Sequence, residues 1–234
     1  MAIAIRHELK YLIGQRQYLV LKSALKGLLN VDPNAARGGG EYAIRSLYFD
    51  NVFDSAYYDK INGVKDRDKY RMRIYNYSDA AIFMECKTKV GNYISKRSVK
   101  IPRSLADRLI AADADGLEFT ANGLLRDVFR EMRVNLLHPA VIVDYDREPY
   151  VHKAEEVRIT FDKNLRTGLN STDIFNAGIT TIPVFDSDVM VLEVKYNRFL
   201  PQYIADIISF SCPEAVQTAV SKYTMCRRYE GMEA

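Results

Sequence analysis

The stretch 69–89 constrains the fold of this chain more than any other, because charged and apolar side chains alternate along it in two runs. Successive side chains of a β-strand point to opposite faces of the sheet. One face of the first run is apolar, and the cations on its other face are Lys69, Arg71 and Arg73. The charged face of the second run holds Glu85, Lys87 and Lys89. Turn-forming residues separate the runs, so the pattern predicts an antiparallel hairpin with one cationic face.

Two arrangements are compatible with such a face. In the common one it is an outer surface in contact with solvent, where most charged strand residues lie. In the other it lines a water-filled concavity that binds a polyanion. The hairpin alone does not separate these arrangements, so the rest of the chain has to be compared with it.

The same alternation recurs in three further segments, on the charged faces Arg6/Glu8/Lys10, Arg158/Thr160/Asp162 and Glu193/Lys195. The chain also contains amphipathic helices, which need an apolar sheet surface to cover. If helices cover the outside, the charged faces point inward, and because an unpaired buried charge costs several kcal/mol, that interior has to be hydrated. Lys and Arg neutralise phosphate oxygens, and carboxylates hold hard divalent cations. The pattern therefore favours an enclosed site for a phosphate chain with a metal ion, although the outer-surface arrangement stays open.

The remaining periodicities predict an α+β chain. Besides the hairpin, strands are expected at 4–12, 42–50, 93–101, 140–147, 156–166 and 189–196. Helices are expected at 16–29, at 54–60, in two pieces within 103–133, at 202–210 and from Pro213 onward. About eight strands without a βαβ rhythm favour a closed, eight-stranded antiparallel barrel with flanking helices. No repeat or linker divides the sequence, so a single domain over 1–234 is predicted.

Composition limits the classes of protein to consider. Hydrophobic residues make up 48% and the net charge is only +3, so charge alone does not indicate nucleic-acid binding. The three cysteines lack C-x-x-C spacing, which fits a reducing compartment. No segment has the form of a signal peptide or reaches the roughly 20 apolar residues of a membrane span. A cytoplasmic protein is therefore expected. No ligand-like spacing involves the histidines, and Cys86 falls on an apolar strand face.

Six short motifs also resemble the VTC domain, and they are His7-Glu8-Leu9-Lys10-Tyr11, Arg45-Ser-Leu-Tyr-Phe-Asp50, Asp68-Lys69-Tyr70-Arg71-Met-Arg73, Glu85-x-Lys87-x-Lys89, Leu192-Glu193-Val194-Lys195-Tyr196 and Ser221-Lys222-Tyr223. This is the polyphosphate polymerase domain of the vacuolar transporter chaperone complex, which also occurs as stand-alone bacterial proteins. It belongs with the CYTH proteins among the triphosphate tunnel metalloenzymes. The resemblance runs in order from about residue 6 to 228, which is nearly the whole chain.

The resemblance implies a tunnel that binds ATP, triphosphate and inorganic polyphosphate with Mn²⁺ or Mg²⁺, and a transfer of the γ-phosphate of ATP onto a polyphosphate chain. It implies three catalytic residues, Arg73, Arg158 and Lys222. The phosphate-binding set is Lys10, Arg45, Lys69, Arg71, Arg73, Lys87, Lys89, Lys96, Arg158, Lys195 and Lys222. The metal ligands are Glu8, Glu85 and Glu193. It further implies no nucleic-acid partner and a possible membrane partner protein that moves the product.

One position departs from the CYTH pattern. CYTH hydrolases typically open with Glu-x-Glu-x-Lys, whereas Arg6 replaces the first carboxylate here. This argues against an efficient triphosphatase, but hydrolysis of tripolyphosphate or nucleoside triphosphates and polyphosphate binding without turnover remain alternatives.

The roles of three individual residues have alternatives as well. Glu193 is a metal ligand or the ion-pair partner of Lys195, Glu85 is a ligand or a counter-charge for Lys87, and Lys222 could be a surface lysine.

Overall fold

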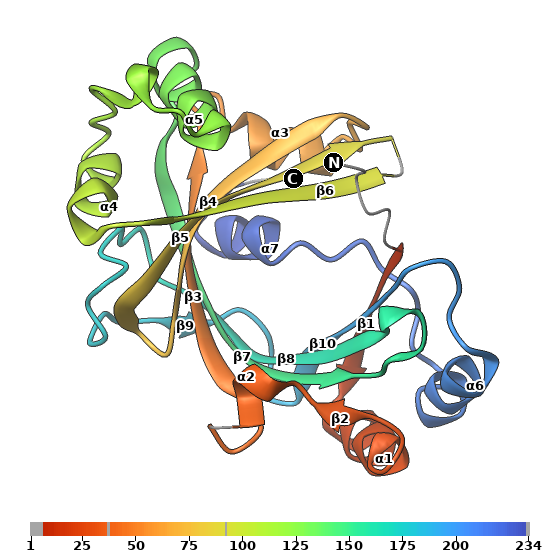
Figure 1. Cartoon of the computed structure of the whole chain (residues 1–234). Helices are drawn as coiled ribbons and strands as arrows, with labels where there is room; N and C mark the ends of the chain where they lie inside the picture. Colours follow the sequence, from red (N-terminus) through yellow and green to blue (C-terminus); the bar gives the residue numbers. More distant parts are fainter. Residues whose placement is uncertain (1–6, 37, 92, 233–234) are drawn as a thin grey trace. The chain divides into compact units, whose positions relative to one another are not determined.

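A computed structural model describes residues 7–36, 38–91 and 93–232, and Arg6 lies outside them. The chain is α+β, and its helices accompany a large antiparallel sheet. It divides into two compact units, each described by itself below. Unit 1 comprises the described residues of 1–43, 145–166 and 183–221, and unit 2 those of 44–144, 167–182 and 222–234. Figure 1 gives the elements in sequence order.

Unit 1 is built on the strand order β1-β10-β8-β7. Its strands are β1 (His7–Gly14), β2 (Asn30–Val31), β8 (Arg158–Thr167, whose last residue belongs to unit 2), β10 (Val189–Tyr196) and the part of β7 (His138–Val151) from residue 145 onward. Short β9 (Ile182–Pro183) pairs with β8, and β2 pairs with β7. The helices are α1 (Gln15–Leu25), α2 (Pro33–Ala36), η2 (Ala154–Glu156) and α6 (Gln202–Ser211).

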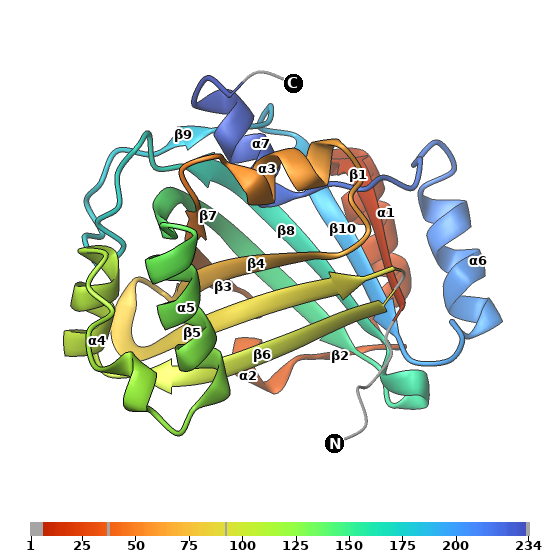
Figure 2. The same cartoon turned by 90° about the horizontal axis from the view of Figure 1, so that it is seen from above.

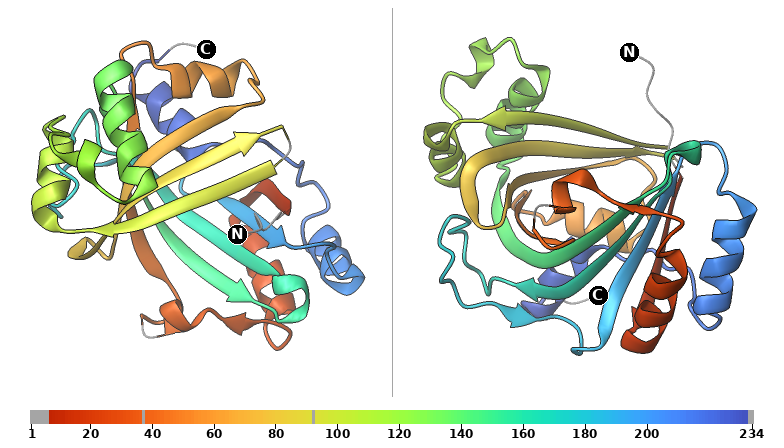
Figure 3. Two further views of the ribbon diagram at one scale, coloured as in Figure 1. Left: turned by 45° about the horizontal axis from the view of Figure 1, so that its top comes forward. Right: turned by 60° about the horizontal axis from the view of Figure 1, so that its bottom comes forward.

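The core of unit 1 lies between one face of these strands and two helices. Leu192 of β10 is paired in register with Phe161 of β8, and both are fully buried. Leu21 of α1 and Ile204 of α6 join the same apolar cluster. Figure 3 shows α1 and α6 side by side next to β1 and β10. Since side chains alternate along a strand, the opposite face of β1, β8 and β10 carries the polar residues.

Unit 2 is built on the order β7-β3-β4-β5-β6. Its strands are β3 (Tyr42–Asp50, whose first two residues belong to unit 1), β4 (Arg67–Tyr75), β5 (Ser78–Val90), β6 (Tyr93–Ile101) and the part of β7 up to residue 144. The helices are α3 (Ser55–Ile61), α4 (Arg103–Ile110), η1 (Leu117–Phe119), α5 (Gly123–Val134) and α7 (Lys222–Tyr229).

Helices cover the apolar face of unit 2. Met72 and Met84 are cross-strand partners without exposed surface, and Val128 of α5 and Leu109 of α4 belong to the same core. Figure 2 shows α4 and α5 over β5 and β6. Asn122 is the N-cap of α5, and its side chain accepts hydrogen bonds from the first-turn amides of Leu124 and Leu125, at 3.0 and 3.2 Å.

The β4–β5 hairpin was predicted from the sequence, and its turn is tighter than expected. Asn76 and Tyr77 have φ angles of 50° and 58°. Two positive φ values in succession are typical of the type I′ turn, whose twist matches that of paired strands. β5 therefore begins at Ser78, and the register shifts between Arg73 and Tyr75.

The boundaries of β3, β6 and β10 agree with the predicted strands 42–50, 93–101 and 189–196. The α+β class and the antiparallel pairing are confirmed, whereas the closed barrel is not. In the described residues, β1 and β7 end the strand order of unit 1, and β7 and β6 end that of unit 2. A helix was predicted from Pro213 onward, but α7 begins only at Lys222. Before it, Gln217 forms a β-bridge with Tyr11, and the Thr218 amide donates a hydrogen bond to the Lys10 carbonyl at 2.8 Å. The single-domain assignment stays a prediction.

Among the described helices, none has the length and hydropathy needed to cross a bilayer.

Candidate functional site

The polar face of unit 1 is organised in rows that cross the strands. Lys10 of β1 pairs in register with Glu193 of β10, which pairs with Thr160 of β8. The next row is Glu8, Lys195 and Arg158. Cross-strand partners on one face have Cβ atoms about 5 Å apart. Pairing alone therefore brings together residues that are distant in the sequence.

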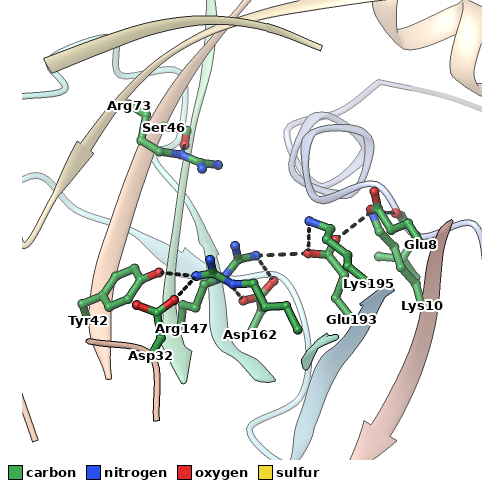
Figure 4. A network of polar contacts seen from close by, with 12 residues as sticks. Glu8, Lys10, Asp32, Tyr42, Ser46, Arg73, Arg147, Asp162, Glu193 and Lys195 are labelled. Atoms are coloured by element: carbon green, nitrogen blue, oxygen red, sulfur yellow. Dashed lines mark hydrogen bonds and ion pairs between the residues drawn. The ribbon is translucent and has the colours of Figure 1, made fainter. Parts of the chain in front are cut away.

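Ion pairs link these rows, as Figure 4 shows. The Lys10 ammonium lies 2.9 Å from Glu8 and 3.3 Å from Glu193. The other Glu193 oxygen lies 2.9 Å from the Lys195 ammonium. Burial alone would lower the pKa of Lys10, but Glu193 and Glu8 outweigh it and raise the pKa above its usual value. Lys10 is therefore a permanent cation shared by two carboxylates.

Arg147 joins the network from β7, and sequence analysis did not assign it. Its Nε and Nη2 atoms donate to the two oxygens of Asp162 at 2.6 and 2.7 Å, and Nη2 lies 3.4 Å from Glu193. Two parallel hydrogen bonds of this kind are the strong form of the Arg–carboxylate pair. Arg147 is the last residue of the strand predicted at 140–147, and no local spacing in the sequence indicated Asp162 as its partner.

Arg158 was predicted to bind phosphate, and here it contacts two other residues of unit 1. Its guanidinium lies 3.0 Å from Asp32 and donates to the Tyr42 hydroxyl at 3.3 Å. Asp32 follows the two-residue strand β2, and sequence analysis missed it because it lies in a turn-forming Asp-Pro-Asn sequence. The partner of Arg158 is thus set by the pairing of β2 with β7.

Thr160 differs from its neighbours on this face. Its residue is only 2% exposed, and its hydroxyl has no hydrogen-bond partner in the part of the chain that the structure describes. A buried hydroxyl without a partner costs about 1–3 kcal/mol. Because Thr160 is the cross-strand partner of Glu193, this unsatisfied group lies beside the carboxylate predicted to bind a metal.

The polar face of unit 2 centres on Glu85, which is 2% exposed. Its carboxylate lies 2.7 Å from Arg71, 3.7 Å from Arg73 and 2.7 Å from Lys96. Burial opposes ionisation of Glu85, but these cations, Arg71 first, lower its pKa to about 2. Glu85, a predicted metal ligand, is thus surrounded by cations and fixes two guanidinium groups.

The predicted phosphate-binding residues of unit 2 form adjoining rows. Lys69, Lys87 and Lys96 are in register across β4, β5 and β6, and Lys89 is in register with Arg67. Arg73 donates to the Ser46 hydroxyl at 3.3 Å, and Arg71 donates to the Tyr48 hydroxyl at 2.9 Å. The pairing therefore gathers the predicted cations of β4, β5 and β6 on one face.

Lys222 is the first residue of α7 and is half-buried. The next residue, Tyr223, is buried and donates a hydrogen bond to Asp50 at the end of β3. Burial, and then Asp50, raises the pKa of Tyr223 above its ordinary value, so its hydroxyl remains a donor. The Ser-Lys-Tyr motif is therefore packed on unit 2 through its tyrosine.

Arg45 lies elsewhere. It is 2% exposed, on the apolar side of β3, and its Nε and Nη2 atoms donate to Asp144 at 2.9 and 2.7 Å. Its Nη1 donates to the carbonyl of Asn176 at 2.6 Å. These contacts hold Arg45, which was predicted to bind phosphate, away from the face of Arg71 and Arg73.

No three His, Cys, Asp or Glu side chains of the described residues are grouped as a metal site would require. Two of the predicted metal ligands, Glu8 and Glu193, share the Lys10 ammonium. Carboxylate oxygens are the donors that Mg²⁺ and Mn²⁺ prefer, and Mg²⁺ sites commonly use one or two carboxylates with substrate phosphates. The donor set fits a divalent cation in kind, with the Thr160 hydroxyl as a further unsatisfied oxygen nearby.

Comparisons with known proteins show the family and the fold. The family model for the VTC domain matches residues 5–229. A putative adenylyl cyclase from Hippeastrum, described as having a dominant triphosphatase activity, has a similar fold, with a TM-score of 0.55, 14% identity and 96% of each chain covered. A putative adenylate cyclase from Bacillus halodurans gives a TM-score of 0.54 and 11% identity over 94% of this chain and 97% of its own. No curated protein sequence matches significantly.

Proposed function

The chain belongs to the VTC domain family, and from that premise we propose that it is a metal-dependent phosphotransferase that moves the γ-phosphate of ATP onto an inorganic polyphosphate chain. The single observation that carries the proposal is that six cations share the polar face of unit 2, where the Glu85 carboxylate contacts three of them, Arg71, Arg73 and Lys96. The other three are Lys69, Lys87 and Lys89. Such an excess of cations suits a polyanion. The closed eight-stranded barrel remains part of this proposal.

The residues of unit 2 bind and orient phosphate. Arg71 and Arg73 donate hydrogen bonds to phosphate oxygens, and Glu85 keeps Arg71 in place through a contact of 2.7 Å. Arginine suits this task because its planar group binds an oxyanion with two parallel hydrogen bonds. The lysine row neutralises the chain as point charges.

Glu8 and Glu193 would hold Mn²⁺ or Mg²⁺, which when bound supplies charge neutralisation on the phosphates. For the cation to bind, the Lys10 ammonium has to release these carboxylates, and the phosphate chain provides its new partner. Arg158 and Lys195 complete the phosphate contacts of unit 1. Glu85 is assigned here to its guanidinium partners rather than to metal.

In the transfer, an oxygen of the terminal phosphate of the polyphosphate chain attacks the γ-phosphorus of ATP. One P–O bond forms, the bond between the γ-phosphorus and the β–γ bridging oxygen breaks, and ADP leaves with that oxygen. In this proposal Lys222 and Arg73 of unit 2 neutralise charge on the transferred phosphate, and Arg158 of unit 1 keeps the catalytic role that the family resemblance implies. Little covalent chemistry is required of the protein, because phosphoryl transfer is catalysed mainly by positioning and electrostatics.

The test is incubation of the protein with ATP and Mn²⁺, following chain length on gels together with ADP and orthophosphate. Chains longer than triphosphate, with one ADP for each unit added, support the proposal. Orthophosphate release without chain growth selects the alternative, hydrolysis of tripolyphosphate or nucleoside triphosphates, which the activity described for the Hippeastrum protein favours. Tight polyphosphate binding without turnover, unchanged by Glu193→Gln, selects a binding module.

Affinity for single-stranded DNA equal to that for polyphosphate would contradict the expectation that nucleic acid is not a partner. A cytoplasmic location and a membrane partner that moves the product stay predictions from the sequence.

A further inference from the structure

Two tyrosines of unit 2 lie against the cations proposed to bind phosphate. The Tyr223 ring lies 4.7 Å from the Lys69 ammonium, measured to the ring centroid, and 5.1 Å from the Tyr48 ring at an interplanar angle of 31°. Tyr48 accepts a hydrogen bond of 2.9 Å from Arg71, whose guanidinium carbon lies 5.7 Å from its ring centroid. The ring pair therefore contacts a lysine through Tyr223 and an arginine through Tyr48.

A ring holds a cation differently from a carboxylate. The negative face of the aromatic ring attracts Lys69, but the ring carries no net charge, so the ring itself does not neutralise the ammonium. A carboxylate in the same place would neutralise it. The hydroxyl of Tyr48 likewise gives Arg71 a neutral acceptor, in addition to the Glu85 carboxylate that Arg71 contacts at 2.7 Å. Neutral partners of this kind fix the positions of cations that must still bind an anion.

Asp50 fixes the pair in turn. Its carboxylate accepts the backbone amides of Asn51, Ala56 and Tyr57, at 2.9, 2.9 and 3.1 Å, at the start of α3. It also accepts the hydroxyl of Tyr223. Tyr223 is 1% exposed and belongs to α7, directly after Lys222. The phenol is thus tied to a carboxylate that is itself held by three amides.

We propose that Tyr48 and Tyr223 are positioning residues, which hold Lys69 and Arg71 in the geometry that binds phosphate and join these cations to α7 and Lys222. The inference rests on the proposed function, because it assigns the anion bound by these cations to a phosphate chain. It adds a role for two neutral side chains that the charge pattern did not indicate. The role of Tyr223 differs from ordinary core packing, since its ring contacts Lys69.

The test is calorimetric titration of the full chain with tripolyphosphate, recording both the dissociation constant and the stoichiometry. Tyr223→Leu removes the ring, and we expect its dissociation constant to rise about tenfold, in the range of one lost cation–π contact and the associated disorder. Tyr223→Phe keeps the ring, so binding should change less than about threefold, while turnover falls because the link to Asp50 is lost.

Tyr57→Phe is the matched control. Tyr57 is also a buried tyrosine at the contact of α3 and α7, where its hydroxyl meets Arg228 and the Met232 carbonyl, each at 3.4 Å. It should lower the melting temperature and leave the dissociation constant unchanged. A purely structural role for Tyr223 would lower only the stoichiometry, as unfolded molecules stop binding.

Tyr48→Leu provides a second variant if Tyr223→Leu does not fold, because Tyr48 is only half-buried. We expect it to raise the dissociation constant by a similar factor. Wild-type affinity in both folded leucine variants would overturn the inference. Failure of the wild-type protein to bind tripolyphosphate would instead contradict the proposed function itself, so the two failures are distinguishable.

Discussion

The polar faces of the two units contain similar residue types in different proportions. Unit 1 has four carboxylates and four cations in ion pairs, which are Glu8, Asp32, Asp162 and Glu193 with Lys10, Arg147, Arg158 and Lys195. The polar face of β4, β5 and β6 in unit 2 has six predicted phosphate-binding cations, and three of them pair with Glu85. A balanced network satisfies its own charges, whereas an excess of one sign favours a ligand of the other sign. We therefore expect anion affinity mainly in unit 2, and we keep the proposed divalent-cation site in unit 1.

The largest expected effect tests the anion side of this comparison. Replacing Arg71 and Arg73 together with alanine should weaken tripolyphosphate binding at least about 100-fold, because each hydrogen bond to a charged group is worth about 1.5–3 kcal/mol. Arg97→Ala is the matched control, since Arg97 lies on the same sheet but pairs with Asp127 of α5. Calorimetry measures both variants. Equal affinities for the double variant and the control would refute the division of roles.

Glu193→Gln tests the cation side. It should weaken the apparent Mn²⁺ affinity by at least about 10–100-fold. Mutation of a residue that is only hydrogen-bonded to a metal ligand already has an effect of this size. Metal-free tripolyphosphate binding should not decrease, because a negative charge has been removed. The measurement is a Mn²⁺ titration of turnover.

Glu148→Gln is the control for this variant. Glu148 is a buried carboxylate of unit 1 that accepts the hydroxyls of Tyr18 and Tyr150, each at 2.6 Å, on the side of α1. It should leave the Mn²⁺ dependence unchanged. If both glutamine variants showed the same Mn²⁺ affinity, Glu193 would not be a ligand.

The loss of folding stability at low pH should be similar for a buried glutamate of each unit, Glu85 in unit 2 and Glu148 in unit 1. Burial opposes ionisation of Glu148, but hydrogen bonds from Lys22, Tyr150 and Tyr18 lower its pKa to about 2, the value that Glu85 also reaches. A lowered pKa in the folded state gives stability that is complete above about pH 4.5 and is lost as the pH falls toward 2. Each carboxylate contributes about 3 kcal/mol by this route.

Urea unfolding of Glu85→Gln and Glu148→Gln at pH 6 and pH 3 measures this contribution. Both variants should be less stable than wild type at pH 6, and the difference should shrink at pH 3. A stability difference that stays constant with pH would show that ionisation of these two groups is not its source.

The smallest expected effect concerns Thr160. Thr160→Val keeps the shape of the side chain and removes a buried hydroxyl without a partner among the described residues. The free energy of unfolding should fall by less than about 1 kcal/mol, or rise, while the dissociation constant for tripolyphosphate with Mn²⁺ rises a few-fold. Thr160→Ser should restore binding. A marked loss of stability with unchanged binding would mean that the hydroxyl serves the fold.

Much of this structure follows from local pattern. Alternation fixes which face of a strand is charged, and it correctly separated Lys69, Arg71 and Arg73 from the core residues between them. The same rule bears on Arg45. Arg45 shares its side of β3 with Leu47 and Phe49, both buried in the core, so alternation places it on the apolar face. Its predicted phosphate contact came from the motif resemblance alone.

Long-range pairing is what the sequence did not reveal. The segment after Pro213 has helical periodicity, but Gln217 pairs with Tyr11 more than 200 positions earlier in the chain. Asp32 likewise reaches Arg158 only because β2 pairs with β7. Such contacts depend on which strands become neighbours, and no local spacing encodes that choice.

The contact between Asp50 and Tyr223 has a consequence for biosynthesis, because it joins positions 173 residues apart. A ribosome completes β3, β4 and β5 long before it reaches residue 223. During that interval the nascent chain has its cationic strands but lacks the aromatic partner of Lys69. If the ring pair orders these cations as proposed, a translation product that stops before residue 223 binds phosphate weakly, and the finished chain acquires its affinity late in synthesis.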